Sequence, residues 1–399
     1  MRRNLRSLSN RNYRLWAAGA SLSYAGTWMQ RTAQTWLVLA ELTDNDASAL
    51  GMLTGLQFAP LVLLLPWSGV AADRFDRRRL LIITQCAQGL LAAALGILTI
   101  SGAVALWHVY MLAFAFGCAT AFDSPASQSF AAELVGDDDL SNAVALNAAA
   151  FNAARLVGPA IAGVLIAAAG TGWVFLINAG SFMAVILALA AIRARELHKV
   201  QDEGFGGMGE GIAYVRSHRR LRTALLALFL VGTFALHFPL LISAMAVKVF
   251  HVGPGRFGLL MSIMAVGSVG GAIAAAGVQR TLLWHLMMGS ALLAGGYACA
   301  ALAPDYWWFA AALTVIGLAA VTFTTSTSSF MQLESDRAMR GRVMALRVAV
   351  ATGATPLGAP LLGLVAEHWG ARWVLVTAAL ASLLAAVAIA RELRLGRQP

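Results

Sequence analysis

Long apolar segments follow one another along the whole chain, with short polar turns between them. Each is about 20 or more residues long, enough for a helix to cross roughly 30 Å of hydrocarbon. The pattern lacks the ~10-residue alternating strands of a membrane barrel. It therefore predicts an all-α membrane protein of twelve transmembrane helices, expected at residues 13–41, 49–72, 79–101, 105–128, 142–168, 172–193, 221–246, 257–279, 282–302, 306–329, 343–367 and 371–391.

Composition supports this interpretation. Hydrophobic residues make up 59% of the 399 residues and charged residues only 12%, about half the charged fraction of a soluble domain. The three cysteines, Cys86, Cys118 and Cys299, lie in apolar segments without metal-ligand spacing. We therefore predict packing roles for them, and no disulfide, metal site or cofactor.

The formal net charge of +10 would suit a nucleic-acid-binding protein, but the basic residues concentrate in alternate loops. With a cytoplasmic N-terminus, 23 of the 29 Lys and Arg residues fall on the cytoplasmic side and 3 on the other. The remaining three fall within predicted helices and are Arg31, Arg155 and Arg347. This bias predicts a multi-pass membrane protein with both termini in the cytoplasm. It indicates contact with membrane lipid and none with nucleic acid.

The two halves of the chain repeat at an offset of 200 residues. Trp and Gly positions keep this register over almost 70 residues, pairing Trp107 with Trp307, Gly117 with Gly317, Gly158 with Gly358, Gly163 with Gly363, and Trp173 with Trp373. Nearer the start the offset becomes 207, so that Gly51 pairs with Gly258. Six helices separate each pair, so the repeat predicts two pseudo-symmetric six-helix bundles in the same orientation. We expect the bundles at 1–193 and 221–399, joined by a cytoplasmic linker at 194–220 with an amphipathic helix from Glu210 to Arg222.

The loop after the second segment carries a recognisable motif, Gly69-Val-Ala-Ala-Asp73-Arg74-Phe-Asp76-Arg77-Arg78-Arg79. It resembles the major facilitator superfamily pattern G-x-x-x-D-R-x-G-R-R, with Asp76 in place of the last glycine. A glycine lets helices approach closely, and a carboxylate such as Asp73 can cap a neighbouring helix N-terminus. We expect a gating latch made of Gly69, Asp73, Arg74, Arg77, Arg340 and Arg342. The alternative, strongest for Arg78 and Arg79, is a loop that only sets membrane orientation.

Four further stretches strengthen the resemblance. Arg155-Leu-Val-Gly158-Pro159 looks like the Gly-Pro motif of superfamily antiporters, and Pro356-Leu-Gly358-Ala-Pro360 repeats it. These prolines remove helix hydrogen bonds, so we predict kinks at Gly158, Pro159, Pro356 and Pro360. The stretches 121–134 and 339–346 resemble the branch of enterobactin exporters and macrolide-efflux proteins. The resemblance implies export of a siderophore or drug by proton antiport.

Polar groups inside predicted helices are the candidates for binding a cargo. An ionisable side chain there costs roughly 2.5–3.5 kcal/mol on insertion scales, which makes it a functional candidate. We predict a substrate site of Gln30, Arg31, Gln34, Asn152, Arg155, Thr324 and Thr325. Two cationic residues without a central acid favour an anionic or polar cargo. The alternative is that these side chains only bond to neighbouring helices or, for Thr, to their own helix.

Proton coupling needs a carboxylate or histidine whose protonation burial can change. Asp123 is the one carboxylate clearly inside a predicted helix, and His237 and Glu41 are further candidates. Asp123 has a rival role as a gate residue paired with a cytoplasmic arginine, and His237 as a hydrogen-bonded structural residue.

The prediction is a secondary active transporter that exports a small molecule by alternating access. The resemblance implies that export is coupled to proton antiport and that the protein lies in the inner membrane of a bacterium. The sequence contains no Walker A motif, so we expect neither ATP hydrolysis nor another enzyme activity, and we expect a monomer. Two alternatives remain open: a carrier for nutrient uptake or facilitated diffusion, and a transport-inactive membrane sensor.

Overall fold

The computed structural model describes residues 2–198, 208–276 and 281–395, and nearly all of them are helical. The first half contains η1 (Arg2–Ser9), α1 (Arg11–Trp36), η2 (Leu37–Leu42), α2 (Ala47–Leu63), α3 (Leu65–Arg74), α4 (Arg77–Ile100), α5 (Leu106–Val135), α6 (Asp137–Ala169), α7 (Thr171–Ala191) and η3 (Ala194–Glu196). The second contains α8 (Met208–Ser217), α9 (Arg219–Phe234), α10 (Phe238–Lys248), α11 (Pro254–Ala276), α12 (Leu283–Ala301), α13 (Tyr306–Glu334), α14 (Arg340–His368) and α15 (Ala371–Leu395).

The chain forms two compact units. Unit 1 comprises Met1–Asp44, Leu56–Glu203 and Gly253–Leu259, and unit 2 comprises Asn45–Gly55, Gly204–Val252 and Leu260–Pro399. Each unit thus includes one short segment from the other half of the sequence.

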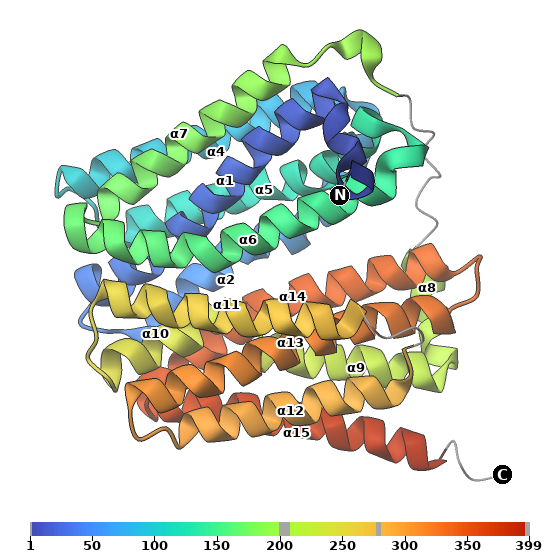
Figure 1. Cartoon of the computed structure of the whole chain (residues 1–399). Helices are drawn as coiled ribbons and strands as arrows, with labels where there is room; N and C mark the ends of the chain where they lie inside the picture. Colours follow the sequence, from blue (N-terminus) through green and yellow to red (C-terminus); the bar gives the residue numbers. More distant parts are fainter. Residues whose placement is uncertain (1, 199–207, 277–280, 396–399) are drawn as a thin grey trace. The chain divides into compact units, whose positions relative to one another are not determined.

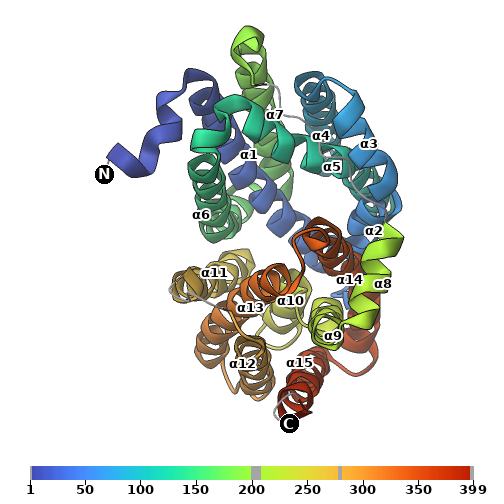
Figure 2. The ribbon, with the colours of Figure 1, turned by 90° about the vertical axis from the view of Figure 1, so that its right-hand side faces the viewer.

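The helices of the two units pack in matching order. In unit 1, α1 packs against α6 and α7, and α4 packs against α5 and α7. In unit 2, α9 packs against α14 and α15, and α12 packs against α13 and α15. Figure 1 shows the neighbouring pairs α4–α7 and α12–α15, and Figure 2 shows α1 between α6 and α7.

Nine helices of the described residues are long and apolar enough to cross a membrane, with α9 and α10 counted together as Arg219–Lys248. Helices α2 and α3, which are bent by 56° relative to each other, make a tenth if they form one span. The predicted segments 13–41 and 282–302 fall outside this set. Helix α1 is polar because it contains Arg11, Arg14, Arg31 and two glutamines, and the apolar content of α12 is diluted by His285 and three glycines. The count of twelve therefore stays a prediction.

Two of the predicted segments are interrupted helices. The segment 49–72 breaks at Leu64, between Pro60 inside α2 and a proline at the start of α3. The segment 221–246 breaks between α9 and α10, where His237 Nε2 lies 2.9 Å from the carbonyl oxygen of Thr233. The Tyr297 hydroxyl also donates to the carbonyl of Ala235. These bonds satisfy carbonyl groups near the break, which is the condition for interrupting a helix inside a membrane protein.

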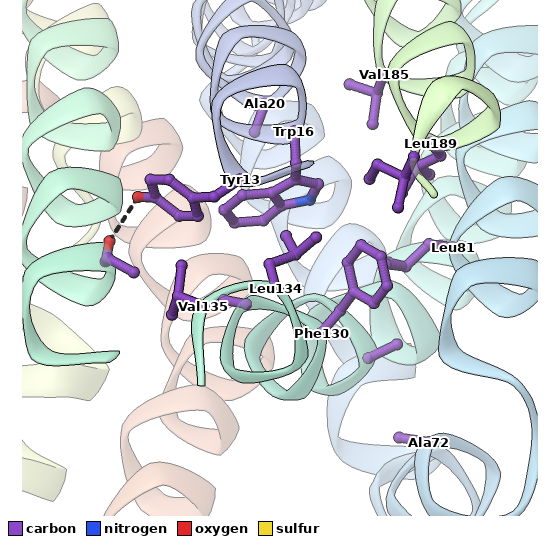
Figure 3. Close-up of a cluster of buried hydrophobic side chains, with 14 residues drawn as sticks. Tyr13, Trp16, Ala20, Ala72, Leu81, Phe130, Leu134, Val135, Val185 and Leu189 are labelled. Atoms are coloured by element: carbon purple, nitrogen blue, oxygen red, sulfur yellow. Dashed lines mark hydrogen bonds between the residues drawn. The ribbon is translucent and has the colours of Figure 1, made fainter. Parts of the chain in front are cut away.

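Unit 1 has a buried cluster of apolar side chains at one end of α1 (Figure 3). Tyr13, Trp16, Phe130 and Leu134 pack there, and the Tyr13 hydroxyl donates a 2.9 Å hydrogen bond to the carbonyl oxygen of Ala143 on α6. The cluster joins α1 to α5 and α6, the helices that carry the candidate site residues of this unit.

Glycine contacts set the spacing of α1 from α6 and of α9 from α14. A Cβ at Gly158 would lie 2.8 Å from Cβ of Trp28, and one at Gly358 would overlap the carbonyl oxygen of Thr233. The short segments repeat this relation: Gly51 packs on Ala359 and Gly363 within unit 2, and Gly258 packs on Pro159 and Gly163 within unit 1. Equivalent positions of the repeat thus make equivalent backbone contacts.

The segment Asn45–Gly55 is also held by polar contacts within unit 2. Glu367 Oε2 accepts from Lys248 Nζ at 2.6 Å and from the amide of Ala47 at 3.2 Å. Asp46 caps α2 by accepting from the backbone and hydroxyl of Ser48 and from the amide of Ala49. Partial burial raises the pKa of Asp46, but these hydrogen bonds and the nearby Lys248 outweigh it, so the pKa lies below its usual value.

We predict that Gly358→Ala destabilises the protein, because the added methyl group cannot fit without separating α14 from α9. Overpacking of this kind costs about 1–3 kcal/mol, measured as a lower midpoint of thermal unfolding of the purified protein. The control is Gly295→Ala on α12, where a Cβ meets no atom within 4 Å. Equal midpoints for the two variants would contradict the packing described here.

Candidate functional site

Two arginines and one tryptophan form the most distinctive polar arrangement in unit 1. The Cζ atom of Arg31 lies 5.1 Å from the ring centroid of Trp28, one turn away on α1, and 5.7 Å from that of Phe58. Cζ of Arg155, on α6, lies 5.8 Å from the centroid of Trp28. Gly158 lies one turn beyond Arg155, where it leaves room for Trp28. We call Arg31, Trp28 and Arg155 the arginine–tryptophan site.

The charge of Arg31 in this site is only partly compensated. Within the described residues, the buried Nε of Arg31 has no hydrogen-bond partner, and no carboxylate lies within ion-pairing distance of Arg31. Cation–π contact with Trp28 and Phe58 offsets part of the cost of its burial. Two guanidinium groups on one ring also repel each other. The arrangement is therefore electrostatically suited to an anion, which would fill the vacant donor and relieve the repulsion.

No described contact joins the other predicted site residues of unit 1 to the arginine–tryptophan site. Gln30 is buried between α1 and α7, where its Oε1 accepts a 2.6 Å hydrogen bond from Asn178 Nδ2. Gln34 is also buried, at 3% exposure. Asn152 Nδ2 donates to the carbonyl oxygen of Ala148 in its own helix at 2.8 Å. These contacts agree with the alternative of bonding within and between helices. Two aromatic residues of the site were not predicted from the sequence. Trp28 had a signal, its position three residues before Arg31, whereas Phe58 lies in another predicted helix and had none.

Several hydroxyl groups of α13 bond back to their own helix. Thr324 Oγ1 donates to the carbonyl oxygen of Ala320 at 2.9 Å, and Thr322 and Thr327 make the same kind of bond. Thr325 is exposed. The carbonyl oxygen of Thr324 accepts a 3.0 Å hydrogen bond from Nη2 of Arg347 on α14.

Asp123 lies in a polar cluster with residues of the adjacent helix α4. Its Oδ1 accepts from Thr84 Oγ1 at 2.6 Å and from Gln85 Nε2 at 2.9 Å. Thr84 Oγ1 also lies 3.0 Å from the carbonyl oxygen of Leu81. Gln85 Oε1 and Gln88 Nε2 are buried without a hydrogen-bond partner in the described residues. No arginine forms a described ion pair with Asp123, so the rival role as a paired gate residue has no support in these contacts.

His237 and Glu41 have local partners. The bond from the His237 ring to the carbonyl of Thr233 spans the break between α9 and α10, and His237 is buried. Glu41 Oε2 accepts from the Thr171 hydroxyl at 2.9 Å, which connects η2 to the start of α7. Neither contact joins them to Asp123.

The predicted latch residues divide into two groups. In unit 1, Arg77 is buried and contacts Glu133 Oε1 at 2.6 Å, while its Nε donates to the carbonyl of Ala72. The side chain of Asp73 lies outside the described residues, and Arg74 is exposed. A Cβ at Gly69 would meet no atom within 4 Å, so the close helix approach expected at Gly69 is absent from the described structure.

The second group lies in unit 2, next to the linker helix α8. Arg342 Nη1 lies 2.9 Å from Glu210 Oε2, and a Cβ at Gly211 would lie 3.1 Å from the Cβ of Arg342. Arg340 Nε donates to the carbonyl oxygen of Gln332 at 2.9 Å. The predicted helix 210–222 is α8 followed by the start of α9, with the break at His218. The predicted kink residues Pro159, Pro356 and Pro360 lie inside helices that continue past them.

Solved structures identify the fold. The chain superposes on a bacterial homologue of the human lysosomal transporter Spinster with a TM-score of 0.78 at 14% identity, covering 96% of this chain and 97% of that one. The POT family transporter PepTSo gives a TM-score of 0.76 at 12% identity, and the match covers 98% of this chain and 99% of that one. The protein therefore has the fold of these multi-pass membrane transporters.

Relatives in sequence identify the family. The profile described as transmembrane secretion effector matches residues 4–398. The Staphyloferrin A transporter of Staphylococcus aureus is 25% identical, with 88% of each chain covered. The multidrug efflux pump Tap of Mycolicibacterium fortuitum is 28% identical, over 94% of this chain and 95% of the relative. Macrolide efflux protein A of Streptococcus pyogenes is 26% identical over 94% of each. The chain belongs to the transmembrane secretion effector family of major facilitator transporters, which confirms the predicted superfamily and branch.

We predict that Glu133→Gln lowers the stability of unit 1, because it removes the carboxylate that contacts the buried Arg77. The loss of a charge-assisted hydrogen bond costs about 1.5–3 kcal/mol, measured as a shift of the thermal midpoint. The comparison pair is Arg193–Glu196, whose side chains are 63% and 48% exposed, so Arg193→Gln should change stability by less than about 1 kcal/mol. If the thermal midpoint of Glu133→Gln is as high as that of Arg193→Gln, the contact between Arg77 and Glu133 does not stabilise the protein.

Proposed function

We propose that this protein is a secondary active transporter that exports a small anionic molecule from the bacterial cytoplasm by alternating access. The observation that carries the proposal is the arginine–tryptophan site, where two guanidinium groups share one aromatic ring and a buried donor has no partner. Two of the relatives support export, since one is described as a multidrug efflux pump and one as a macrolide efflux protein, and a third is described as the Staphyloferrin A transporter.

The charge of the site favours one class of cargo over another. A lipophilic cation would add a third positive charge beside Arg31 and Arg155, whereas a carboxylate or another oxyanion would accept hydrogen bonds from a guanidinium in a bidentate geometry. A flat or apolar part of the same molecule could rest on Trp28 and Phe58. An anionic metal chelator of the siderophore type therefore fits better than a cationic drug.

Proton coupling is assigned to Asp123, because its hydrogen bonds can serve both protonation states. When the carboxylate is ionised, Thr84 and Gln85 donate to it. When it is protonated, it can donate to Thr84 Oγ1, and the Thr84 hydroxyl then turns to the carbonyl oxygen of Leu81, 3.0 Å away. The Thr84 hydroxyl therefore has a hydrogen-bond acceptor in both protonation states of Asp123, which keeps the free-energy cost of protonation and deprotonation low. His237 and Glu41 remain secondary candidates.

In the proposed topology, the protein crosses the bacterial inner membrane twelve times and has both termini in the cytoplasm. The protein would work as a monomer. Alternating access would come from movement of two bundles, 1–193 and 221–399, which the linker 194–220 joins. The matching helix contacts of the two units support this arrangement, as does the concentration of basic residues in alternate loops. The latch residues Arg77, Arg340 and Arg342 contact neighbouring elements at the ends of spans, as a gate would require.

We predict that Arg31→Gln and Arg155→Gln each reduce export of an anionic cargo by roughly tenfold or more, because a hydrogen-bonded charge pair is worth about 1.5–3 kcal/mol. The cargo is first chosen by thermal stabilisation of the purified protein with a panel of siderophores and antibiotics. Export is then measured in proteoliposomes. Arg195→Gln, which changes an exposed arginine outside the spans, is the control. Normal export by both site variants would remove the basis for an anionic cargo.

We predict that Asp123→Asn abolishes cargo movement driven by a pH gradient but keeps exchange of labelled for unlabelled cargo. The amide keeps the shape of the side chain and loses the proton-binding site. The wild-type protein should also dissipate a pH gradient when cargo is added, whereas Asp139→Asn, a change at the partly exposed acid of the Arg6 ion pair, should behave like the wild type. Gradient-driven transport by Asp123→Asn at the wild-type rate would exclude Asp123 as the coupling residue. Cargo movement indifferent to pH in the wild type would favour facilitated diffusion.

A further inference from the structure

Arg347 is a third arginine inside a span, and it belongs neither to the arginine–tryptophan site nor to the polar cluster of Asp123. It lies on α14 within the membrane-spanning stretch Arg340–His368. Its Nη2 donates to the carbonyl oxygen of Thr324 at 3.0 Å, but its Nε is buried without a hydrogen-bond partner among the described residues. No described carboxylate lies within ion-pairing distance of it. Such a group is costly to keep in a membrane, so its retention needs a reason.

The internal repeat shows that the fold does not need a charge at this position. At the offset of 200 residues, Arg347 corresponds to Asn147 on α6. The correspondence is structural as well, since Gly158 of α6 and Gly358 of α14 pack against the equivalent helices α1 and α9. Asn147 accepts a 2.9 Å hydrogen bond from the Tyr24 hydroxyl, so a neutral side chain with a local partner satisfies this position in unit 1.

Helix α13, to which Arg347 donates, also carries hydroxyl groups without a described hydrogen bond, Ser328 among them. Ser328 lies four residues beyond Thr324 and thus on the same face of α13. Its hydroxyl makes no hydrogen bond to a described residue, whereas the hydroxyl groups of Thr324 and Thr327 donate to backbone carbonyl oxygens. Nε of Arg347 is thus a vacant donor in unit 2 that suits an oxyanion, and hydroxyl groups of α13 such as that of Ser328 can also donate to one.

We propose that Arg347 is a binding residue of unit 2 for an oxyanion group, a carboxylate of the cargo. The inference rests on the proposed export of an anionic molecule and extends it by naming a residue of unit 2 that would bind a carboxylate of that molecule. It assigns to α14 a role in cargo selection in addition to its packing on α9.

The test measures binding of a simple polycarboxylate to the full-length purified protein. The probe is tricarballylate, a flexible molecule with three carboxylates, and its uncharged trimethyl ester is the ligand control. Apparent Kd is obtained from the rise of the thermal midpoint with ligand concentration. We expect Arg347→Gln to raise the Kd for tricarballylate roughly tenfold, the effect of losing one hydrogen-bonded charge pair, and Arg347→Lys to retain part of the affinity. The variant Arg347→Met serves if the glutamine variant fails to fold.

Arg391→Gln is the matched protein control, because it removes the same charge from an exposed position of unit 2. It should leave the Kd unchanged, and the ester should show no difference among the variants. A phosphate of an anionic lipid is the other source of an oxyanion. If phosphatidylglycerol stabilises wild type more than Arg347→Gln while tricarballylate binds both equally, the bound group is a headgroup and the inference is overturned.

Parallel titration of Arg31→Gln separates this inference from the proposed function. Weaker binding in Arg31→Gln with unchanged binding in a folded neutral variant of Arg347 would overturn the inference and leave the anionic cargo in place. Weaker binding only in the Arg347 variant would support the inference and reject the arginine–tryptophan site. If tricarballylate does not stabilise the wild-type protein at any concentration at which it is soluble, both the inference about Arg347 and the proposed anionic cargo are contradicted.

Discussion

Close backbone contact through glycine is the constraint on which the described arrangement depends. Helices in hydrocarbon gain little from burying apolar side chains against each other, so small residues that allow close approach supply much of the packing. Here the contacts recur in register: Gly158 against α1 and Gly358 against α9, with Gly258 on α6 and Gly51 on α14. Each contact fixes the distance and the rotation of a helix pair. A polar side chain on the same helix then has a defined neighbour, which a flexible interface would not provide.

The arginine–tryptophan site follows from this fixed geometry. Because Gly158 leaves room for Trp28, the ring lies against α6 where Arg155, one turn earlier, can reach its face. Arg31 reaches the same ring from α1 through its i, i+3 relation to Trp28. The ring tolerates both cations but cannot accept their hydrogen bonds, so Nε of Arg31 is left vacant. Donors held in place without partners bind a ligand without first breaking protein contacts, which is the advantage of a preorganised site.

Much of the fold could be predicted from the sequence, because hydropathy and repeat register are properties of single positions. The helical class, the family and the equivalence of residues 200 apart were readable from Gly, Trp and apolar spacing. What single positions do not encode is the rotation of each helix toward its neighbours. Gln30 and Arg31 are adjacent in sequence, yet Gln30 bonds to Asn178 on α7 and Arg31 lies on Trp28. The breaks at Leu64 and before His237 also depend on neighbours, such as Tyr297, that satisfy exposed carbonyl groups. Arg347 was visible only as a charge in a helix, because its vacant Nε becomes evident from the packing of α13 and α14.

The proposed exchange of an anion for a proton has a consistent electrostatic logic. Moving a charged group through a low-dielectric region is costly, and pairing or protonation lowers that cost. An anionic cargo would neutralise part of the positive charge on Arg31 and Arg155, while a proton would neutralise Asp123 on the separate α4–α5 pair. The two events involve different helices of one unit, so neither blocks the other sterically. Coupling between them then requires that the neutralised forms favour different conformations, and this difference in free energy sets how strongly a proton gradient can drive the cargo.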